Sequence, residues 1–160
     1  MTEAGRRAEG VALRLRGHHL LCLFGFRGLG YSAAFVENMR SVAEAFFGQG
    51  GADVELLDEC DDICRACPRE KDGRCVARPD SEVSIRARDA RALTRLGLVA
   101  GERRPAAWLR DKVAEKISPA ELGDICVGCE WLSAGYCQEG LGAHARARQG
   151  AGVDGGPTAG

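Results

Sequence analysis

The chain has 160 residues, a formal net charge of −1 and a charged fraction of 28%, which fits one folded domain of ordinary polarity. A net charge this close to zero provides no overall attraction to nucleic acid or to a membrane surface, so we expect neither as a partner. No apolar run reaches the length of a membrane span, and Arg14 and Arg16 interrupt any signal-peptide core. Eight cysteines without an export signal indicate a reducing, cytoplasmic location, where thiolates serve metals or catalysis.

Three segments are expected along the chain. Residues 1–10 are predicted to be a flexible N-terminus and residues 11–138 a cysteine-rich metal-binding domain. Residues 139–160 are rich in Gly and Ala and contain almost nothing to bury, which predicts a disordered tail. Inside the domain, an acidic run at 53–62 and a basic stretch at 86–104 are expected to be solvated faces that attract each other. The alternative for the basic stretch is a docking surface for a protein partner.

The first half of the domain shows two strand patterns and one helix pattern. Apolar and basic residues alternate over 11–16, which predicts a short strand. A glycine-rich loop follows at 25–31. Ser32 is suited to cap a helix that reaches about Phe47, because apolar side chains recur at helical spacing. Residues 54–57 predict a second strand, which leads into the first cysteines.

The second half reads as helical. Residues 81–96 predict a helix that ends at Gly97, and another helix is expected to begin near Pro105. Residues 118–121 have the form of a capping box that starts a short helix. The predicted fold class is therefore α+β, a small single domain. It is mainly helical, with a short sheet from the N-terminal strand and the strand before Cys60, and with two cysteine-rich ligand loops.

One pattern occurs twice, in residues 62–75 and 124–137. Both segments fit D-I-C-x2-C-x5-G-x-C, which indicates an internal repeat. The C-x2-C pair can turn two thiolates toward one metal. The aspartate, Asp62 or Asp124, is expected to accept a hydrogen bond from the backbone N–H of the first cysteine. The glycine, Gly73 or Gly135, is expected to take a positive φ so that the chain turns back.

The repeat predicts six metal ligands: Cys64, Cys67, Cys75, Cys126, Cys129 and Cys137. A tetrahedral zinc or a four-iron cluster needs four ligands, so either each loop takes a fourth ligand from elsewhere or both converge on one centre. Cys22, His18 and His19 are candidates, because on a helix one His–Cys pair would share a face. Cys60 forms a C-x3-C-x2-C pattern found in radical-SAM enzymes. The chain is too short for the barrel of such an enzyme, so we do not count Cys60 among the predicted ligands.

Several motifs resemble a known prokaryotic family of short cysteine-rich proteins. Residues 16–22, 25–32 and 35–39 look like its opening, and residues 61–75 and 125–137, with Trp131, look like its later motifs. The family is domain of unknown function 1284. The resemblance spans roughly residues 12–138 and implies iron–sulfur binding by the cysteines. Cys60 is less typical of the family's pattern.

Three functions fit these features. The first is an iron–sulfur protein with a redox or accessory role, not an enzyme by itself and without catalytic residues; Pro68 after Cys67 resembles ferredoxin ligation. The alternative is a structural zinc module that presents an interaction surface. The third is a thiol–disulfide oxidoreductase, since C-x2-C at a helix start lowers a thiol pKa. The third cysteine of each loop and the lack of a βαβ pattern argue against it.

Overall fold

A three-stranded sheet anchors the part of the chain that the computed structural model describes, residues 12–49, 52–129 and 131–155. Strand β1 (Leu13–Arg16) pairs in parallel with β2 (Asp53–Leu57), and β2 pairs antiparallel with β5 (Arg103–Pro105). The two predicted strands and their place in one sheet are confirmed. Strand β5 was not predicted, because three residues that are all exposed show no periodicity. The predicted flexible residues 1–10 lie outside the described part.

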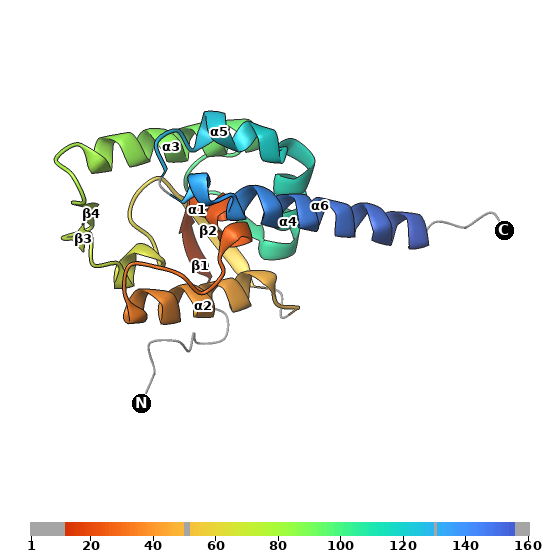
Figure 1. Ribbon diagram of the computed structural model, residues 1–160, viewed down its shortest axis with the longest axis horizontal. Coiled ribbons are helices and arrows are strands. Elements are labelled where there is room, and N and C mark those ends of the chain that lie inside the picture. The colour runs from red at the N-terminus through yellow and green to blue at the C-terminus, as the bar shows by residue number, and fades with distance from the viewer. Residues whose placement is uncertain (1–11, 50–51, 130, 156–160) are drawn as a thin grey trace.

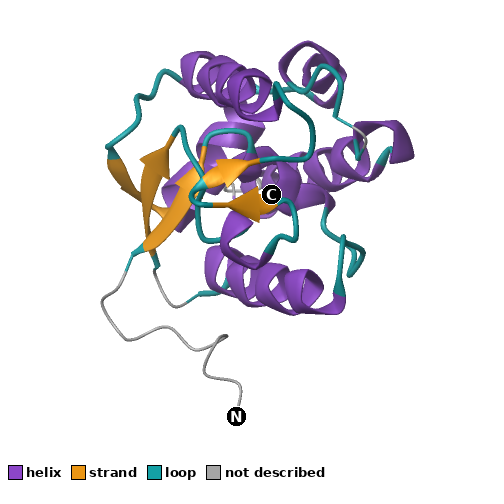
Figure 2. Ribbon diagram, turned by 90° about the vertical axis from the view of Figure 1, so that its left-hand side faces the viewer, coloured by secondary structure: helices purple, strands orange, loops and turns teal. Residues whose placement is uncertain are grey.

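Helices make up most of the described chain, and in Figure 2 they lie above, below and to the right of the strands. The α+β class with helices predominating is therefore confirmed. In Figure 1 the central strands lie between α2 at the bottom and α3 with α5 at the top. The helices, with 3₁₀ turns marked η, are α1 (His19–Cys22), η2 (Leu23–Gly25), α2 (Ala33–Phe47), η3 (Cys64–Ala66), α3 (Ser81–Leu96), α4 (Ala106–Lys116), η4 (Pro119–Glu121), α5 (Leu122–Ile125), η5 (Leu132–Ala134) and α6 (Tyr136–Gly155). A hairpin of β3 (Glu70–Lys71) and β4 (Arg74–Cys75) completes the elements.

The ends of the long helices follow their local sequence. The Ser32 hydroxyl accepts a hydrogen bond of 3.1 Å from the Phe35 N–H, as expected of an N-cap. Helix α3 ends at Gly97, which has φ 73°. The predicted capping box at 118–121 is wrong, because the Ser118 side chain makes no cap hydrogen bond. Glu121 instead forms an ion pair of 2.9 Å with Arg95 on α3.

Helix α6 replaces part of the predicted disordered tail. Residues 136–155 are helical, and Leu141 is 1% exposed. A Cβ on Gly140 would lie 1.7 Å from the Phe24 carbonyl oxygen, so only glycine lets α6 pack this closely on η2. The composition misled us because Gly and Ala bury little area themselves, yet their small size allows close contact. The last residues of the predicted tail, 156–160, lie outside the described part.

The core forms where the sheet meets the helices. Leu13, Leu15, Val54 and Leu56 of the sheet are all 0% exposed. Arg16 at the end of β1 is only 1% exposed, although it is charged, because Asp89 on α3 meets its guanidinium. None of the helices in the described ranges is long and apolar enough to span a membrane.

Candidate metal centre

The two copies of the repeat share the same backbone turns. In the first copy, the N–H of Cys67 donates to the carbonyl of Cys64 at 2.8 Å. In the second copy, the N–H of Cys129 donates to the carbonyl of Cys126 at 3.0 Å. The predicted positive φ is also found in both, at 80° for the first glycine and 82° for the second. The two copies of the repeat therefore share their backbone conformation as well as their sequence pattern.

The aspartates of the repeat do not play the role that we predicted. Asp61, one residue before the repeat aspartate, accepts hydrogen bonds of 3.0 Å from the N–H groups of Ile63 and Cys64. The carboxylate of Asp62 accepts from the Arg14 N–H instead. In the second copy Asp124 is exposed, and the Cys126 N–H donates to a helical carbonyl. Among the described residues of the two loops, only the first copy thus has an aspartate that shapes the turn before its first cysteine.

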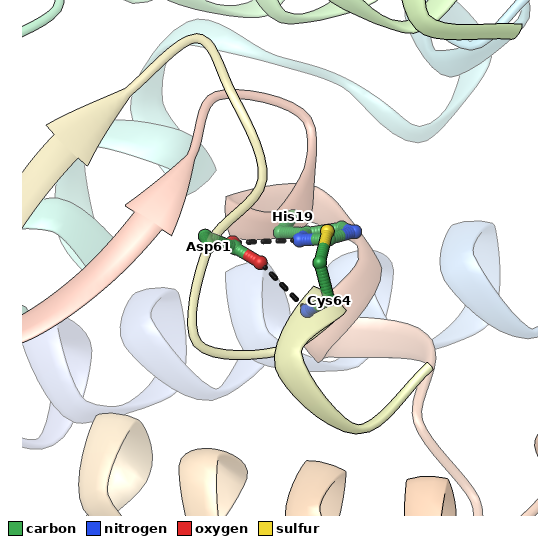
Figure 3. Close-up of side chains that lie close together, drawn as sticks. All are labelled: His19, Asp61 and Cys64. Atoms are coloured by element: carbon green, nitrogen blue, oxygen red, sulfur yellow. Dashed lines mark hydrogen bonds and ion pairs between the residues drawn. The ribbon is translucent and has the colours of Figure 1, made fainter. Parts of the chain in front are cut away.

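Asp61 also holds the side chain of His19 (Figure 3). Its second oxygen accepts from the Arg16 N–H at 2.8 Å and lies 2.7 Å from His19 Nδ1. Among the described residues, His19, Asp61 and Cys64 are the one group of three potential ligands whose ligand atoms all lie within 4.8 Å of one another. Burial opposes the charge of Asp61, but His19 and the backbone donors hold its pKa at about 2. Four hydrogen bonds occupy this carboxylate, so it orients its neighbours.

His18 is paired with a second buried carboxylate. Its Nδ1 lies 2.6 Å from Asp89, which is itself 0% exposed. Burial and the neighbouring His19 lower the pKa of His18 to about 4, although Asp89 acts in the opposite direction. For His19, burial is outweighed by Asp61, and the pKa is raised. Both rings therefore have Nδ1 engaged by a carboxylate, which leaves Nε2 as the nitrogen for any further partner.

Arg16 connects this network to two thiols. Its Nη1 lies 3.6 Å from Cys64 Sγ and 3.7 Å from Cys60 Sγ, and its Nε donates to Asp89 at 2.8 Å. Burial disfavours the guanidinium charge, but Asp89 and Cys64 more than compensate and raise the pKa of Arg16. Cys60 lies beside Cys64, and the hydrogen bond between the two thiols lowers the pKa of Cys60. A positive charge is thus buried against the sulfurs of the first loop.

Cys22 joins the second loop. Burial raises the pKa of its thiol well above the usual value, and the next contributions come from Cys137, Cys129 and Cys126. The close approach of η2 to Cys137 depends on Gly25, where a Cβ would lie 2.7 Å from Cys137 Sγ. The structure therefore brings one of the predicted fourth-ligand candidates to the second cysteine triplet.

Both loops face one cavity of about 680 Å³. The first cysteine group, Cys64, Cys67 and Cys75, contributes all three side chains to its wall. The second cysteine group, Cys126, Cys129 and Cys137, contributes the last two, and Cys22, His18 and His19 also line it. Cys60 and Cys126 do not. Residues that are more than a hundred positions apart thus share one space.

Tyr31 bridges the two loops at this cavity. Its hydroxyl accepts a hydrogen bond of 2.7 Å from Trp131 Nε1, and the guanidinium carbon of Arg69 lies 4.1 Å above its ring. Arg69 and Trp131 occupy equivalent positions in the repeat, each two residues after the second cysteine. The same ring therefore contacts both copies.

Helix α3 supports both loops from behind. Glu82 accepts a hydrogen bond of 2.8 Å from the Cys75 N–H, while Arg91 donates to the Ile125 carbonyl at 3.0 Å and Arg88 to the Val127 carbonyl at 3.1 Å. The expected attraction between the acidic run and the basic stretch is present in the Arg86–Asp58 ion pair of 3.5 Å. Much of the basic stretch thus contacts other parts of the same chain, although most of its arginines are exposed.

A family model described as Protein of unknown function (DUF1284) matches residues 30–135. The chain belongs to this family. The match includes Tyr31, Asp61 and five of the six repeat cysteines, while Cys137 and residues 18–22 lie just outside it. Neither the comparison with curated proteins nor that with solved structures gives a match.

Sequence reasoning missed several residues that build this site in the DUF1284 protein. The Asp-Asp pair before Cys64 was a signal for Asp61, but spacing alone pointed to the second aspartate. Arg16 looked like the polar side of a strand, and Asp89 lies in a helix with no local signal. Tyr31 was seen only as part of a glycine-rich loop. Each acts through a contact with a residue far away in the chain.

Proposed function

We propose that the protein binds iron–sulfur clusters through its two cysteine groups and has a redox or accessory role in a reducing compartment. The observation that carries this proposal is the shared cavity, whose wall includes five of the six repeat thiols and Cys22. Cysteine thiolates are the standard ligands of iron–sulfur clusters. When bound, a cluster supplies one-electron transfer, and the chain contributes the ligands, the buried charge of Arg16 and the cover formed around Tyr31.

The spacing of the thiols supports a cluster over a single zinc ion. A tetrahedral zinc holds sulfurs about 2.3 Å away and therefore about 3.8 Å from one another. No three cysteine thiols of the described residues lie within 4.8 Å of one another. A four-iron cluster is a cage of metal and sulfide atoms, so its thiolates stand farther apart. The donor set of thiolates fits a cluster, and the described residues contain no closely spaced thiol triplet of the kind that a zinc ion needs.

The acidity of the thiols argues against the thiol–disulfide alternative. Burial and neighbouring thiols raise the pKa of Cys126 to about 12 and that of Cys137 to about 11. A reactive redox cysteine needs the opposite shift, because the thiolate is the nucleophile. Buried thiols of this kind release their protons when a metal replaces them. The raised pKa values of Cys126 and Cys137 therefore argue against a reactive thiol in the second group.

Anaerobic purification tests the proposal. We expect brown protein that contains iron and acid-labile sulfide in similar amounts. Colourless protein with stoichiometric zinc would contradict the cluster and favour the interaction module. Cys64→Ala and Cys126→Ala are expected to lower the metal content, and Cys60→Ala to lower it less.

The size of the iron loss in these variants shows whether the protein has one metal centre or two. If each cysteine group forms its own centre, either substitution removes about half of the iron and Cys64→Ala with Cys126→Ala removes nearly all. If both groups share one centre, each single substitution removes nearly all of it. Equal losses for Cys60→Ala and Cys64→Ala would show that Cys60 is a ligand.

A further inference from the structure

We propose that His19 is the fourth ligand of the first cysteine group and binds through Nε2, so that the two groups have unequal donor sets. This inference rests on the proposed function, because it assigns a residue to a cluster at that site. The first group then combines three thiolates with one imidazole. The second group, completed by Cys22, consists of sulfur alone.

The geometry of His19 is that of a ligand held in place. Its Nδ1 is fixed at 2.7 Å from Asp61, and its side chain lines the cavity that Cys64, Cys67 and Cys75 also line. In metal sites, a ligating imidazole commonly binds through one nitrogen while a carboxylate holds the other. Figure 3 shows the His19 ring beside Cys64, with one ring nitrogen directed at Asp61.

The other side chains near the first cysteine group are less suited to be its fourth ligand. Both oxygens of Asp61 are occupied by four hydrogen-bond donors, which leaves it a supporting role. The ligand atoms of His19 and Cys64 belong to one group within 4.8 Å, and His18 is not part of that group. Cys60 lies outside the D-I-C-x2-C-x5-G-x-C repeat, and its thiol contacts Arg16 and Glu82.

Unequal donor sets give the two centres unequal potentials. A neutral imidazole in place of a thiolate reduces the negative charge of a centre and raises its reduction potential. The buried guanidinium of Arg16, 3.6 Å from Cys64 Sγ, acts in the same direction. The centre at the first group is therefore the stronger electron acceptor of the two.

The test is nitrogen hyperfine spectroscopy on reduced, anaerobically prepared full-length protein, together with iron content and redox titration. Wild-type protein is expected to show a coupling to histidine nitrogen and two separate reduction steps. His19→Cys is expected to keep the iron but lose the nitrogen coupling, and its higher reduction step is expected to shift to lower potential. His19→Ala is expected to lose up to half of the iron.

His144→Ala is the control, because His144 lies on α6 and does not line the cavity. It is expected to retain the iron and the nitrogen coupling. Wild-type protein that has iron and sulfide but no nitrogen coupling would overturn the assignment and leave the proposed function intact. Equal iron losses in both alanine variants, without recovery in His19→Cys, would reduce His19 to a structural role. Zinc in place of iron would overturn both proposals.

Discussion

The carboxylate of Asp61 accepts hydrogen bonds from three backbone N–H groups and one imidazole, although its side chain is 0% exposed. Its donors come from β1, from α1 and from the turn that carries Cys64. A carboxylate with this many donors is stabilised in its charged form despite burial. One residue thereby fixes both a histidine and the first cysteine loop.

We therefore expect Asp61→Asn to lower the free energy of unfolding strongly, although it conserves the size of the side chain. The amide keeps the size but loses the charge and turns an N–H₂ group toward donors, and breaking a buried charged contact costs about 3–5 kcal/mol. Urea unfolding of the metal-free protein measures this loss. Asp124→Asn, at an exposed position of the second copy, is the control and should change the free energy of unfolding by less than about 0.5 kcal/mol.

The same pair of variants differs in pH dependence. The pKa of Asp61 falls from 3.8 to about 2 on folding, so its charge contributes stability above the unfolded value, which is lost as the pH falls toward 2. Asp61→Asn should lack this part of the acid sensitivity, whereas Asp124→Asn should keep it. Identical acid profiles for Asp61→Asn and wild type would contradict the assigned role.

At the scale of elements, the second cysteine group depends on how α6 meets η2. Cys137 lies in the first turn of α6, and Cys22 directly precedes η2. Gly140 and Gly25 are the points of closest approach, because a Cβ on either would overlap atoms across the contact. The distance between α6 and η2 therefore decides whether Cys22 reaches the second group.

Gly140→Ala is expected to separate these two elements. The added Cβ would lie 1.7 Å from the Phe24 carbonyl oxygen, which is backbone and cannot rotate away, and overpacking of this kind costs about 1–3 kcal/mol or more. We expect lower thermal stability and about half of the wild-type iron. Gly123→Ala in α5 is the control, since nothing lies within 4 Å of the added Cβ; wild-type iron content in Gly140→Ala would contradict this account.

At the scale of the whole molecule, Tyr31 connects two loops that belong to different parts of the chain. The hydrogen bond from Trp131 spans 100 positions, and the Arg69 contact reaches the other copy of the repeat. Aromatic rings with a polar tip are suited to such positions, because they exclude water while the hydroxyl finds a partner. Tyr31, Arg69 and Trp131 all line the cavity that both groups share.

Tyr31→Leu is expected to speed the loss of metal from both groups, because it removes the ring beneath Arg69 and the acceptor for Trp131. Tyr31→Phe keeps the ring and should fall between Leu and wild type. The measurement is the rate of iron transfer to a chelator under anaerobic conditions. Trp108→Leu, which alters an exposed aromatic side chain on α4 away from the cavity lining, should leave the rate unchanged; a similar acceleration there would show general loosening.

Features that depend on a few neighbouring residues could be read from the sequence. The Ser32 cap, the end of α3 at Gly97 and the positive φ of Gly73 and Gly135 each follow from local backbone geometry. The C-x2-C turns belong to the same class, since each is closed by one hydrogen bond across three residues. For this reason the two cysteine loops and helices α2, α3 and α4 were predictable, whereas α6 was not.

Only the tertiary structure decided which residues complete the site. Asp61 meets His19 across 42 positions and Arg16 meets Asp89 across 73, and neither pair has a local signal. Cys22 reaches the second group because Gly25 and Gly140 allow α6 to pack against η2. Short-range hydrogen bonding determines turns and caps, whereas the pairing of distant side chains depends on which helix faces pack together. The sequence by itself therefore determined the two cysteine loops, and packing determined which distant side chains lie beside them.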